Sequence, residues 1–192
     1  MTAERLAYWR LKFTALAQLV LQRREAALAV FSAMRERWPH DAYVLGSRSH
    51  LNARLGRSAE ALADAQALTA AHPLRGAADW FNLAFLLDEA GRPEDAEPAF
   101  RQALALDQRL DRAWYGLGLA LIRLRRLDEA VVAFKRNTEL QPMSPYGWYQ
   151  MARVQLDRRQ PAEARRIVRH LQGFEPRVAA QLEREIGAAQ CS

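Results

Sequence analysis

The chain has 192 residues with a formal net charge of +6, and 50% of its residues are hydrophobic while 26% are charged. This balance is typical of a folded globular protein of one or two domains and excludes an intrinsically disordered chain. Because Cys191 is the only cysteine, an internal disulfide framework and a cysteine-based metal site are excluded as well. Only two of the 28 basic residues are lysines, Lys12 and Lys135, so we attribute the positive charge to a coding bias toward arginine and consider nucleic-acid binding unlikely to be the function.

The first predicted element is a helix within the first twenty residues. Its basic residues and the apolar run FTALAQLVL could be misread as a secretion signal, but QRRE follows instead of a small-residue cleavage site. No apolar run in the sequence reaches the roughly 18 residues that a membrane span needs. We therefore expect a bacterial-type protein of the cytoplasm.

Trp80, Trp114 and Trp148 mark a sequence repeat, because they lie 34 residues apart. Small residues, a second apolar position and a closing proline recur at the same step: Gly118 with Ala84 and Ala152, Ala130 with Ala96 and Ala164, Phe134 with Phe100 and Val168, and Pro142 with Pro176. Two weaker copies lie upstream, at Ala27, Phe31 and Pro39 and then at Ala61 and Pro73. The step from Ala61 to Ala96 is 35 residues, which places one inserted residue near Gly76.

The repeat divides the chain into five copies and a short C-terminal segment, in the order 8–41, 42–75, 77–110, 111–144, 145–178 and 179–190. A period of this length is typical of a solenoid of two-helix units. In the fourth repeat, Trp114 and Leu117 lie at helical spacing before the turn RRLD, and Pro142 ends a second helix because its ring removes a donor. Gly118 and Ala130 are small where the two helices approach closely, and we expect the tryptophan to fill the wedge between neighbouring repeats.

This pattern resembles the tetratricopeptide repeat, which carries Trp at position 4, Leu at 7, Gly or Ala at 8, Ala at 20, Phe at 24 and Pro at 32. The fourth repeat matches in full, and the third departs only at the closing proline, where Gln108 stands. The resemblance covers residues 8–178 and implies an all-α, right-handed helical-repeat solenoid, a superhelix of antiparallel helix pairs, in a single domain over residues 1–192. Residues 179–188 would form a capping helix that covers the apolar edge of the fifth repeat through Leu182 and Ile186.

The resemblance also implies a non-catalytic scaffold or adaptor, because the family consists of binding proteins with many partners. The four histidines form no metal-ligand motif and no constellation with a nucleophile. The run GLGLA at Gly116 lies inside a predicted helix, where it favours close helix packing over a phosphate-binding loop. We therefore expect no catalytic residue, no metal and no cofactor.

In proteins of this family the first helix of each repeat lines a concave groove. Carried onto this sequence, the groove positions give a partner-binding set: Trp9, Lys12, Phe13, Leu16, Tyr43, His50, Phe81, Asn82, Phe85, Arg112, Tyr115, Tyr146, Tyr149 and Arg153. Aromatic and arginine side chains are common anchors of binding surfaces, so an aromatic-lined groove for a partner peptide or protein segment is predicted. Some of these aromatic rings could instead turn inward and fill gaps between helices. We also expect Asp88 and Glu89 at the rim of the groove.

The family's clamp for the C-terminal carboxylate of a peptide is incomplete here. In the best window, the second to fourth repeats, Asn82 matches the clamp and Arg112 nearly does, while His50, Gly46 and Gly116 replace the other clamp residues. We therefore expect this protein to hold its partner in another way.

The first helix is apolar almost all round, in the stretch YWRLKFTALAQLVL. An end helix of a solenoid normally has a polar outer face, because nothing packs beyond it. We expect some of Trp9, Phe13, Leu16 and Val20 to be exposed and to dock on a partner protein or a second copy of the chain. The alternative function is therefore a self-associating assembly protein, a homodimer or larger homo-oligomer formed through residues 8–21. The helix could also tilt and bury these side chains in its own groove.

Overall fold

The computed structural model describes residues 2–190 of the chain, with side chains up to Gly187; Cys191 lies outside the described residues. The described chain is all-helical, and its helices follow one another in this order: α1 (Ala3–Val20), α2 (Arg24–Arg37), α3 (Ala42–Arg54), α4 (Ser58–Ala71), α5 (Ala77–Glu89), α6 (Pro93–Leu106), α7 (Asp111–Arg123), α8 (Leu127–Leu140), α9 (Pro145–Asp157), α10 (Pro161–Gln172) and α11 (Pro176–Gln190).

The helices confirm the predicted fold class. The first helix of the second to fifth repeats begins at the first residue of its repeat, at Ala42, Ala77, Asp111 and Pro145. In contrast, α1 begins at Ala3, ahead of the first predicted repeat, and has 18 residues where the other first helices have 13. Thr2 starts this longer helix, because its side-chain oxygen accepts a hydrogen bond from the backbone N–H of Arg5 at 3.4 Å.

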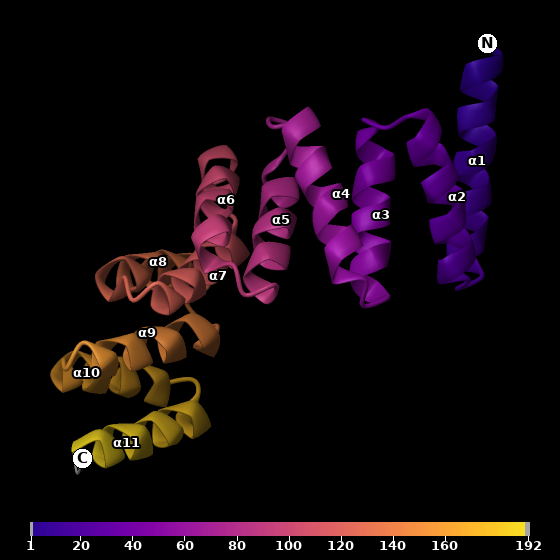
Figure 1. The fold of residues 1–192 in the computed structure, drawn as a ribbon. Coiled ribbons are helices and arrows are strands. Elements are labelled where there is room, and N and C mark those ends of the chain that lie inside the picture. The colour runs from indigo at the N-terminus through magenta and orange to yellow at the C-terminus, as the bar shows by residue number, and fades with distance from the viewer. Residues whose placement is uncertain (1, 191–192) are drawn as a thin grey trace. The chain divides into compact units, whose positions relative to one another are not determined.

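Two compact units make up the described chain (Figure 1). The N-terminal unit runs up to Ala90 and holds α1 to α5, and the C-terminal unit starts at Gly91 and holds α6 to α11. Within each unit, consecutive helices pack side by side. The single domain expected from the sequence remains a prediction.

The core of the N-terminal unit fills the space between α1, α2 and α3. Phe31, Met34 and Val44 are fully buried there, and Ala15 is the one buried residue of α1. A polar cluster lies beside this core, where the fully buried Asp64 pairs with Arg35 and Arg48 and accepts a hydrogen bond from Asn52 at 3.3 Å. Burial raises the pKa of the Asp64 carboxyl, against the opposing effect of the two arginines, so its ionised form depends on these partners.

The core of the C-terminal unit explains the two glycines of the run GLGLA. A Cβ atom on Gly118 would lie 2.6 Å from Cζ of the buried Phe134, and one on Gly116 would lie 2.4 Å from Cζ of the buried Phe100. Both contacts are far closer than atoms can approach, so neither site has room for a larger side chain. The prediction of close helix packing is confirmed.

The repeated tryptophans lie beside the turns between successive repeats. Trp80, Trp114 and Trp148 are only partly buried. Their indole Nε1–H groups donate to backbone carbonyls in the preceding inter-repeat turns: those of Pro73 at 2.8 Å, Gln108 at 2.9 Å and Pro142 at 2.9 Å. Trp80 reaches back seven residues and the other two reach back six, which places the inserted residue in the turn that contains Gly76, as predicted. Each ring therefore fastens the turn that leads into its own helix.

The C-terminal segment forms the expected terminal helix. α11 packs on α10 and α9, and it buries Leu182 and Ile186 together with Ala179. Among the described residues, no helix combines the length and the apolar character that crossing a lipid bilayer would require.

Candidate partner-binding surfaces

A cluster of two aromatic rings and a cation lies on the N-terminal unit, where α1 faces α3. The Lys12 Nζ atom lies 3.8 Å from the ring centroid of Tyr43 and 5.1 Å from that of Trp9. Attraction between the ammonium group and the ring faces holds the two helices together at this point. Three of the predicted site residues are therefore in contact, and Phe13 extends the cluster because its ring lies 5.7 Å from Trp9.

The outer side of α1 is apolar and exposed, as expected. The exposed fractions are 39% for Trp9, 62% for Phe13, 37% for Leu16 and 82% for Val20. The helix does not tilt to bury these residues, because its other side already packs on α2 through Leu11 and Ala15 and their neighbours.

His50 is exposed and lines a hollow of about 440 Å³ in the N-terminal unit. The other lining residues come from α1, α2, α3 and the turn after α1: Leu19, Gln22, Arg24, Ser47, Leu51 and Arg54. The polar groups are an amide, a hydroxyl, an imidazole and two guanidinium groups, and no carboxylate lines the hollow. No hydrogen bond or ion pair within the described chain occupies their side chains, so the hollow offers donors that suit a carboxylate.

The predicted residues of α5 divide between surface and interior. Phe81 and Phe85 stack with ring centroids 6.4 Å apart, and Phe85 is 50% exposed. Asn82 is exposed as well. The expectation that Asp88 lies at the rim of the groove is wrong, because this side chain is buried; Glu89 is exposed.

In the C-terminal unit, Tyr115 contributes to the interior. Its ring is partly buried and meets the buried ring of Phe134 edge-on at 5.8 Å. Tyr146 behaves differently, with 70% of its surface exposed, and Arg112 is exposed too. The aromatic surface of this unit is therefore smaller than its repeat positions suggest.

Tyr149 and Arg153 contact the terminal helix α11. The Tyr149 hydroxyl donates to Oε1 of Glu185 at 2.9 Å and accepts a hydrogen bond from Nε2 of Gln181 at 3.0 Å. Arg153 Nε lies 3.7 Å from Oε2 of the same Glu185. Burial, and then the hydrogen bond to Glu185, raise the pKa of the Tyr149 hydroxyl. Gln181 and Glu185 lie four residues apart on α11, so both side chains lie on one face of that helix. This spacing is the feature of the sequence from which the contact with α9 could have been predicted.

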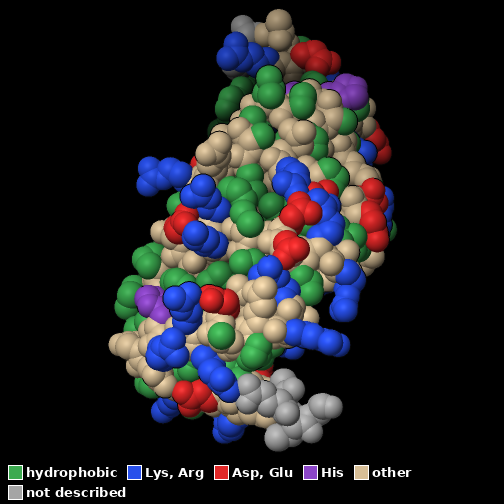
Figure 2. All heavy atoms as spheres, turned by 90° about the vertical axis from the view of Figure 1, so that its left-hand side faces the viewer, with side chains coloured by type: hydrophobic (Ala, Val, Ile, Leu, Met, Phe, Trp, Pro, Cys, Tyr) green, Lys and Arg blue, Asp and Glu red, His purple; other side chains and the backbone are tan. Residues whose placement is uncertain are grey.

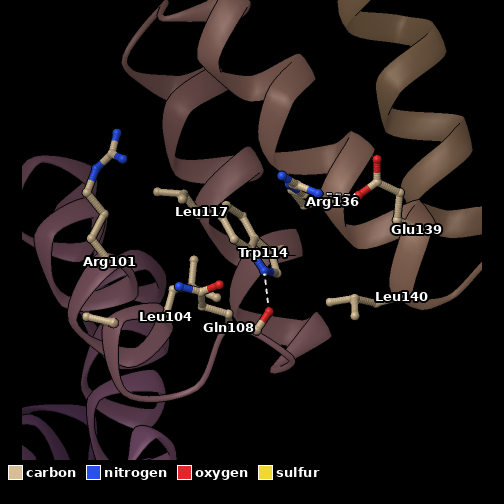
Figure 3. Close-up of a pocket in the computed structure, with 9 residues that line it drawn as sticks. Arg101, Leu104, Gln108, Trp114, Leu117, Arg136, Glu139 and Leu140 are labelled. Carbon is tan, nitrogen blue, oxygen red and sulfur yellow. Dashed lines mark hydrogen bonds and ion pairs between the residues drawn. The ribbon is translucent and has the colours of Figure 1, made fainter.

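The sequence did not reveal a second hollow, of about 480 Å³, between α6, α7 and α8 (Figure 3). Leu104, Leu117 and Leu140 give it apolar walls, and Trp114 projects into it. Its indole N–H is already bonded to Gln108, and two further lining residues, Arg136 and Glu139, pair with each other at 2.7 Å. With these polar groups satisfied, the hollow offers few free hydrogen-bonding groups to a ligand.

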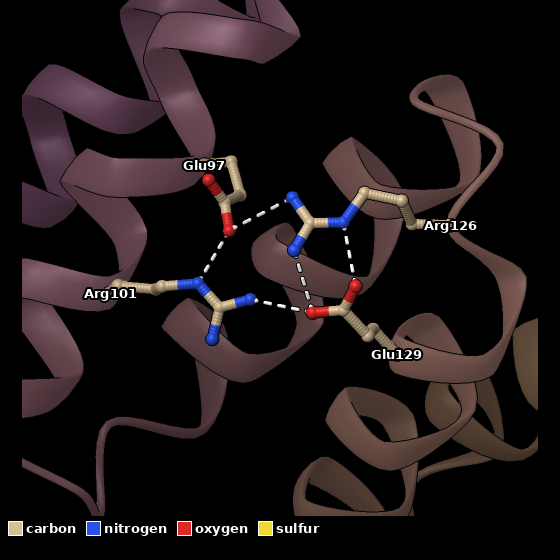
Figure 4. Close-up of polar contacts among 4 residues, drawn as sticks. All are labelled: Glu97, Arg101, Arg126 and Glu129. Atoms are coloured by element: carbon tan, nitrogen blue, oxygen red, sulfur yellow. Dashed lines mark hydrogen bonds and ion pairs between the residues drawn. The ribbon is translucent and has the colours of Figure 1, made fainter.

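Four charged residues join α6 to α8 in a closed ring of ion pairs (Figure 4). Arg101 binds Glu97 and lies 2.9 Å from Glu129, while Arg126 lies 2.6 Å from Glu129 and 3.3 Å from Glu97. The hydrogen bond from Arg126 lowers the pKa of Glu129. Figure 2 likewise shows basic side chains interspersed with acidic ones on the face in view, not gathered into one stripe.

Comparisons with known proteins agree with this architecture. A family profile described as tetratricopeptide repeat matches residues 81–145, the part of the sequence with the clearest motifs. This segment matches the tetratricopeptide repeat family, and the described chain has the fold of tetratricopeptide repeat proteins. A search among curated proteins finds no match.

Solved tetratricopeptide repeat structures share the fold of nearly the whole chain. The MamA protein aligns with a TM-score of 0.82 at 15% identity, over 88% of this chain and 92% of that chain. YrrB, described as a TPR protein with an unusual peptide-binding site, aligns with a TM-score of 0.80 at 19% identity, over 88% of each chain. MamA from Desulfovibrio magneticus RS-1 aligns with a TM-score of 0.77 at 18% identity, over 96% of this chain and 98% of that chain. At these identities the likeness establishes the fold.

Proposed function

We propose that this protein is a non-catalytic tetratricopeptide repeat scaffold of the bacterial cytoplasm, which binds a segment of a partner protein on the N-terminal unit. The observation that carries the proposal is the surface formed by α1 and α3. An aromatic and cationic cluster at Tyr43 lies at one end of this surface, and the donor-lined hollow at Arg54 lies at the other. The peptide-binding site named for YrrB, a protein of the same fold, supports the proposal.

The dimensions of this surface suit a short extended segment. Tyr43 and Arg54 are 11 residues apart on α3, which corresponds to about 16 Å along the helix. An extended chain of about five residues spans that distance. We infer that an apolar or aromatic side chain of the partner contacts Tyr43 and Trp9, while an Asp or Glu enters the hollow between Arg24 and Arg54.

The shifted pKa values of the chain have structural explanations that do not require catalysis. Tyr8 donates to Asp41, Tyr149 donates to Glu185, and Asp64 is buried against two arginines. Each group is paired with a neighbour that holds helices together, and none of them faces a nucleophile. A binding role therefore explains the perturbed groups better than an enzymatic one.

Selection from a library of displayed random peptides tests the proposal. We expect enriched sequences to combine an acidic residue with an aromatic or aliphatic one, and their affinity to fall on the order of 100-fold when Tyr43→Ala and Arg54→Ala are combined. Tyr146→Ala with Arg112→Ala is the matched control on the C-terminal unit and should leave the affinity unchanged. Enriched peptides that bind the Tyr43 and Arg54 variant normally would refute this site.

Self-association through the first repeat is the second candidate function, and the exposed apolar side of α1 is the observation that favours it. A mass above that of one chain in light scattering, reduced to one chain by Leu16→Glu with Val20→Glu, would support it. A monomer at every concentration tested would eliminate it.

A further inference from the structure

The exposed apolar residues of α1 follow a heptad pattern. Leu6, Trp9, Phe13, Leu16 and Val20 are separated by three, four, three and four residues, and the smallest exposed fraction among them is 37%. We name these five residues the α1 seam. A repeat of alternating three and four residues keeps one narrow stripe on a helix, and this is the pattern with which a helix pairs with another helix.

Apart from Trp9, whose ring contacts Lys12 and Tyr8, the fold itself does not use the α1 seam. α1 packs on α2 and the neighbouring core through its opposite side, with Tyr8, Leu11, Ala15 and Leu19. From Leu6 to Val20 the seam is about 21 Å long, which is two heptads and enough for about four turns of a partner helix. Exposed apolar surface of this continuity usually marks an interaction site.

The edges of the α1 seam carry positive charge only. Arg5 and Arg10 are exposed, and their guanidinium groups have no hydrogen bond or ion pair within the described chain. Lys12 adds a third positive charge, fixed between Trp9 and Tyr43. The acidic residue of α1, Glu4, points to α2, where it pairs with Arg37 at 2.7 Å. A helix that docks on this seam therefore meets arginines along its edges.

We propose that the α1 seam docks one amphipathic helix of another protein, with an apolar heptad repeat bordered by acidic residues. Charge complementarity selects this occupant, because like charges that face each other across an interface repel and weaken binding. In a pair of α1 helices from two copies, arginines and a lysine would border both sides of the interface. The remaining large exposed hydrophobic residues of the described chain outside α1 and its flanking Leu21 lie on several different helices and turns and form no second heptad: Leu74, Phe85, Leu106, Val132, Met143 and Tyr146.

A helix fits the α1 seam better than a lipid surface does. The seam is a narrow stripe, whereas helices that lie in a membrane interface present a broad apolar face under a strongly basic one. Stable attraction to anionic lipid takes a cluster of several unpaired basic residues, and here Lys12 is engaged with two rings. This docking shares Trp9 with the α1 and α3 surface of the proposed function, but Arg54 and the donor-lined hollow take no part in it.

Two synthetic peptides of equal length test the inference directly. Both peptides are helical and carry leucine at the apolar positions of their heptad repeat. They differ only at the positions that flank these leucines, which are glutamate in one peptide and lysine in the other. Titrated against the full chain by fluorescence anisotropy, the glutamate peptide is expected to bind at least on the order of 10-fold more tightly than the lysine peptide. Equal affinities, or no binding of the glutamate peptide, would overturn the proposal.

Variants of the full chain locate the site. The double substitution Leu16→Glu with Val20→Glu should lower the affinity for the glutamate peptide on the order of 100-fold or more. Val132→Glu, which changes a residue that is 60% exposed on α8, is the matched control and should have no effect. Arg5→Glu with Arg10→Glu should reverse the preference, so that the lysine peptide becomes the tighter ligand. Retained preference in that variant would show that the flanking charges do not select the partner.

Two further measurements test whether a second copy of the chain or a membrane surface binds the α1 seam instead. A concentration-dependent dimer in light scattering that Leu16→Glu with Val20→Glu abolishes would assign the seam to a second copy and contradict the proposal. Binding to vesicles of phosphatidylcholine and phosphatidylserine, lost in the same variant, would assign it to a membrane surface and contradict the proposal as well. Variants that keep the wild-type circular dichroism spectrum make each of these results interpretable.

Discussion

The end helices α1 and α11 differ in whether their apolar side chains are buried or exposed. α11 buries Leu182 and Ile186 and leaves mainly polar side chains outside, while α1 buries little more than Ala15 and exposes Phe13 and Val20. Both helices are nevertheless fastened by a tyrosine that bonds to a carboxylate of another helix or its cap: Tyr8 of α1 to Asp41, and Tyr149 to Glu185 of α11. The comparison teaches that an end helix can be held in place by a few anchors while its apolar surface remains open to a partner.

Substitutions in the buried interior are expected to lower the free energy of unfolding most. They serve as the reference for substitutions in the end helices. Phe134 is fully buried and Phe13 is 62% exposed, so the same change separates interior from surface. Phe134→Ala is expected to lower the free energy of unfolding by about 3–5 kcal/mol, and Phe13→Ala by less than about 0.5 kcal/mol. Equilibrium urea unfolding followed by circular dichroism measures both. Comparable losses would mean that α1 is buried in solution.

A leucine pair tests the two end helices against each other. Leu182 is fully buried on α11, whereas Leu16 is 37% exposed on α1. We expect Leu182→Ala to cost about 2–5 kcal/mol of unfolding free energy and Leu16→Ala less than about 1 kcal/mol. The same urea experiment gives both values. If Leu182→Ala were the milder change, α11 would not act as the cap of its unit.

The tyrosines that fasten the end helices, Tyr8 and Tyr149, are expected to contribute least to the free energy of unfolding. The contribution of Tyr8 should also depend on pH. Burial, reinforced by Asp41, raises the pKa of Tyr8 to about 12 from an ordinary value of 10. Because the folded state holds this proton more tightly than the unfolded state, the stability that it contributes is complete below pH 10 and is lost as the pH rises toward 12. We expect the stability of Tyr8→Phe to fall less steeply over this interval.

Tyr149 is the corresponding anchor at the other end of the chain, and because its pKa is raised as well, Tyr149→Phe should also reduce the loss of stability at high pH. Tyr149→Phe removes the corresponding bond to Glu185 and should cost about 0.5–1.5 kcal/mol at neutral pH, as should Tyr8→Phe. Thermal unfolding at a series of pH values compares the two variants with the wild type. Identical slopes for Tyr8→Phe and the wild type would contradict an anchoring role for Tyr8.

Most of the fold was predictable because local residues decide it. The recurring tryptophans, the small residues at Gly118 and Ala130 and the closing prolines located the helices to within a few residues, and even the residue inserted near Gly76 was placed in the correct turn. These features act within one helix pair or one turn, so a repeat pattern contains the information. The early start of α1 was missed, because the capping Thr2 lies outside the repeat.

The partner-binding residues were harder to predict, because exposure depends on what a neighbouring helix supplies. Tyr115 and Tyr149 occupy the same repeat position, yet one meets Phe134 and the other meets Glu185 of α11. The hollow beside His50 depends on three helices and a turn that come together only in the fold. Repeat position alone therefore indicates which side chains reach a face and does not indicate which of them remain available to a partner.

The indole hydrogen bonds at Trp80, Trp114 and Trp148 bear on how such a chain can change in length over evolution. Each bond spans a joint between successive repeats, and the joint before Trp80 holds one residue more than the joints before Trp114 and Trp148 without losing the bond. A single-residue insertion is thus absorbed at a joint, whereas inside a helix it would rotate every following side chain by about 100°. Gene duplication with breakpoints in these joints would add or remove whole modules and keep every fastening intact.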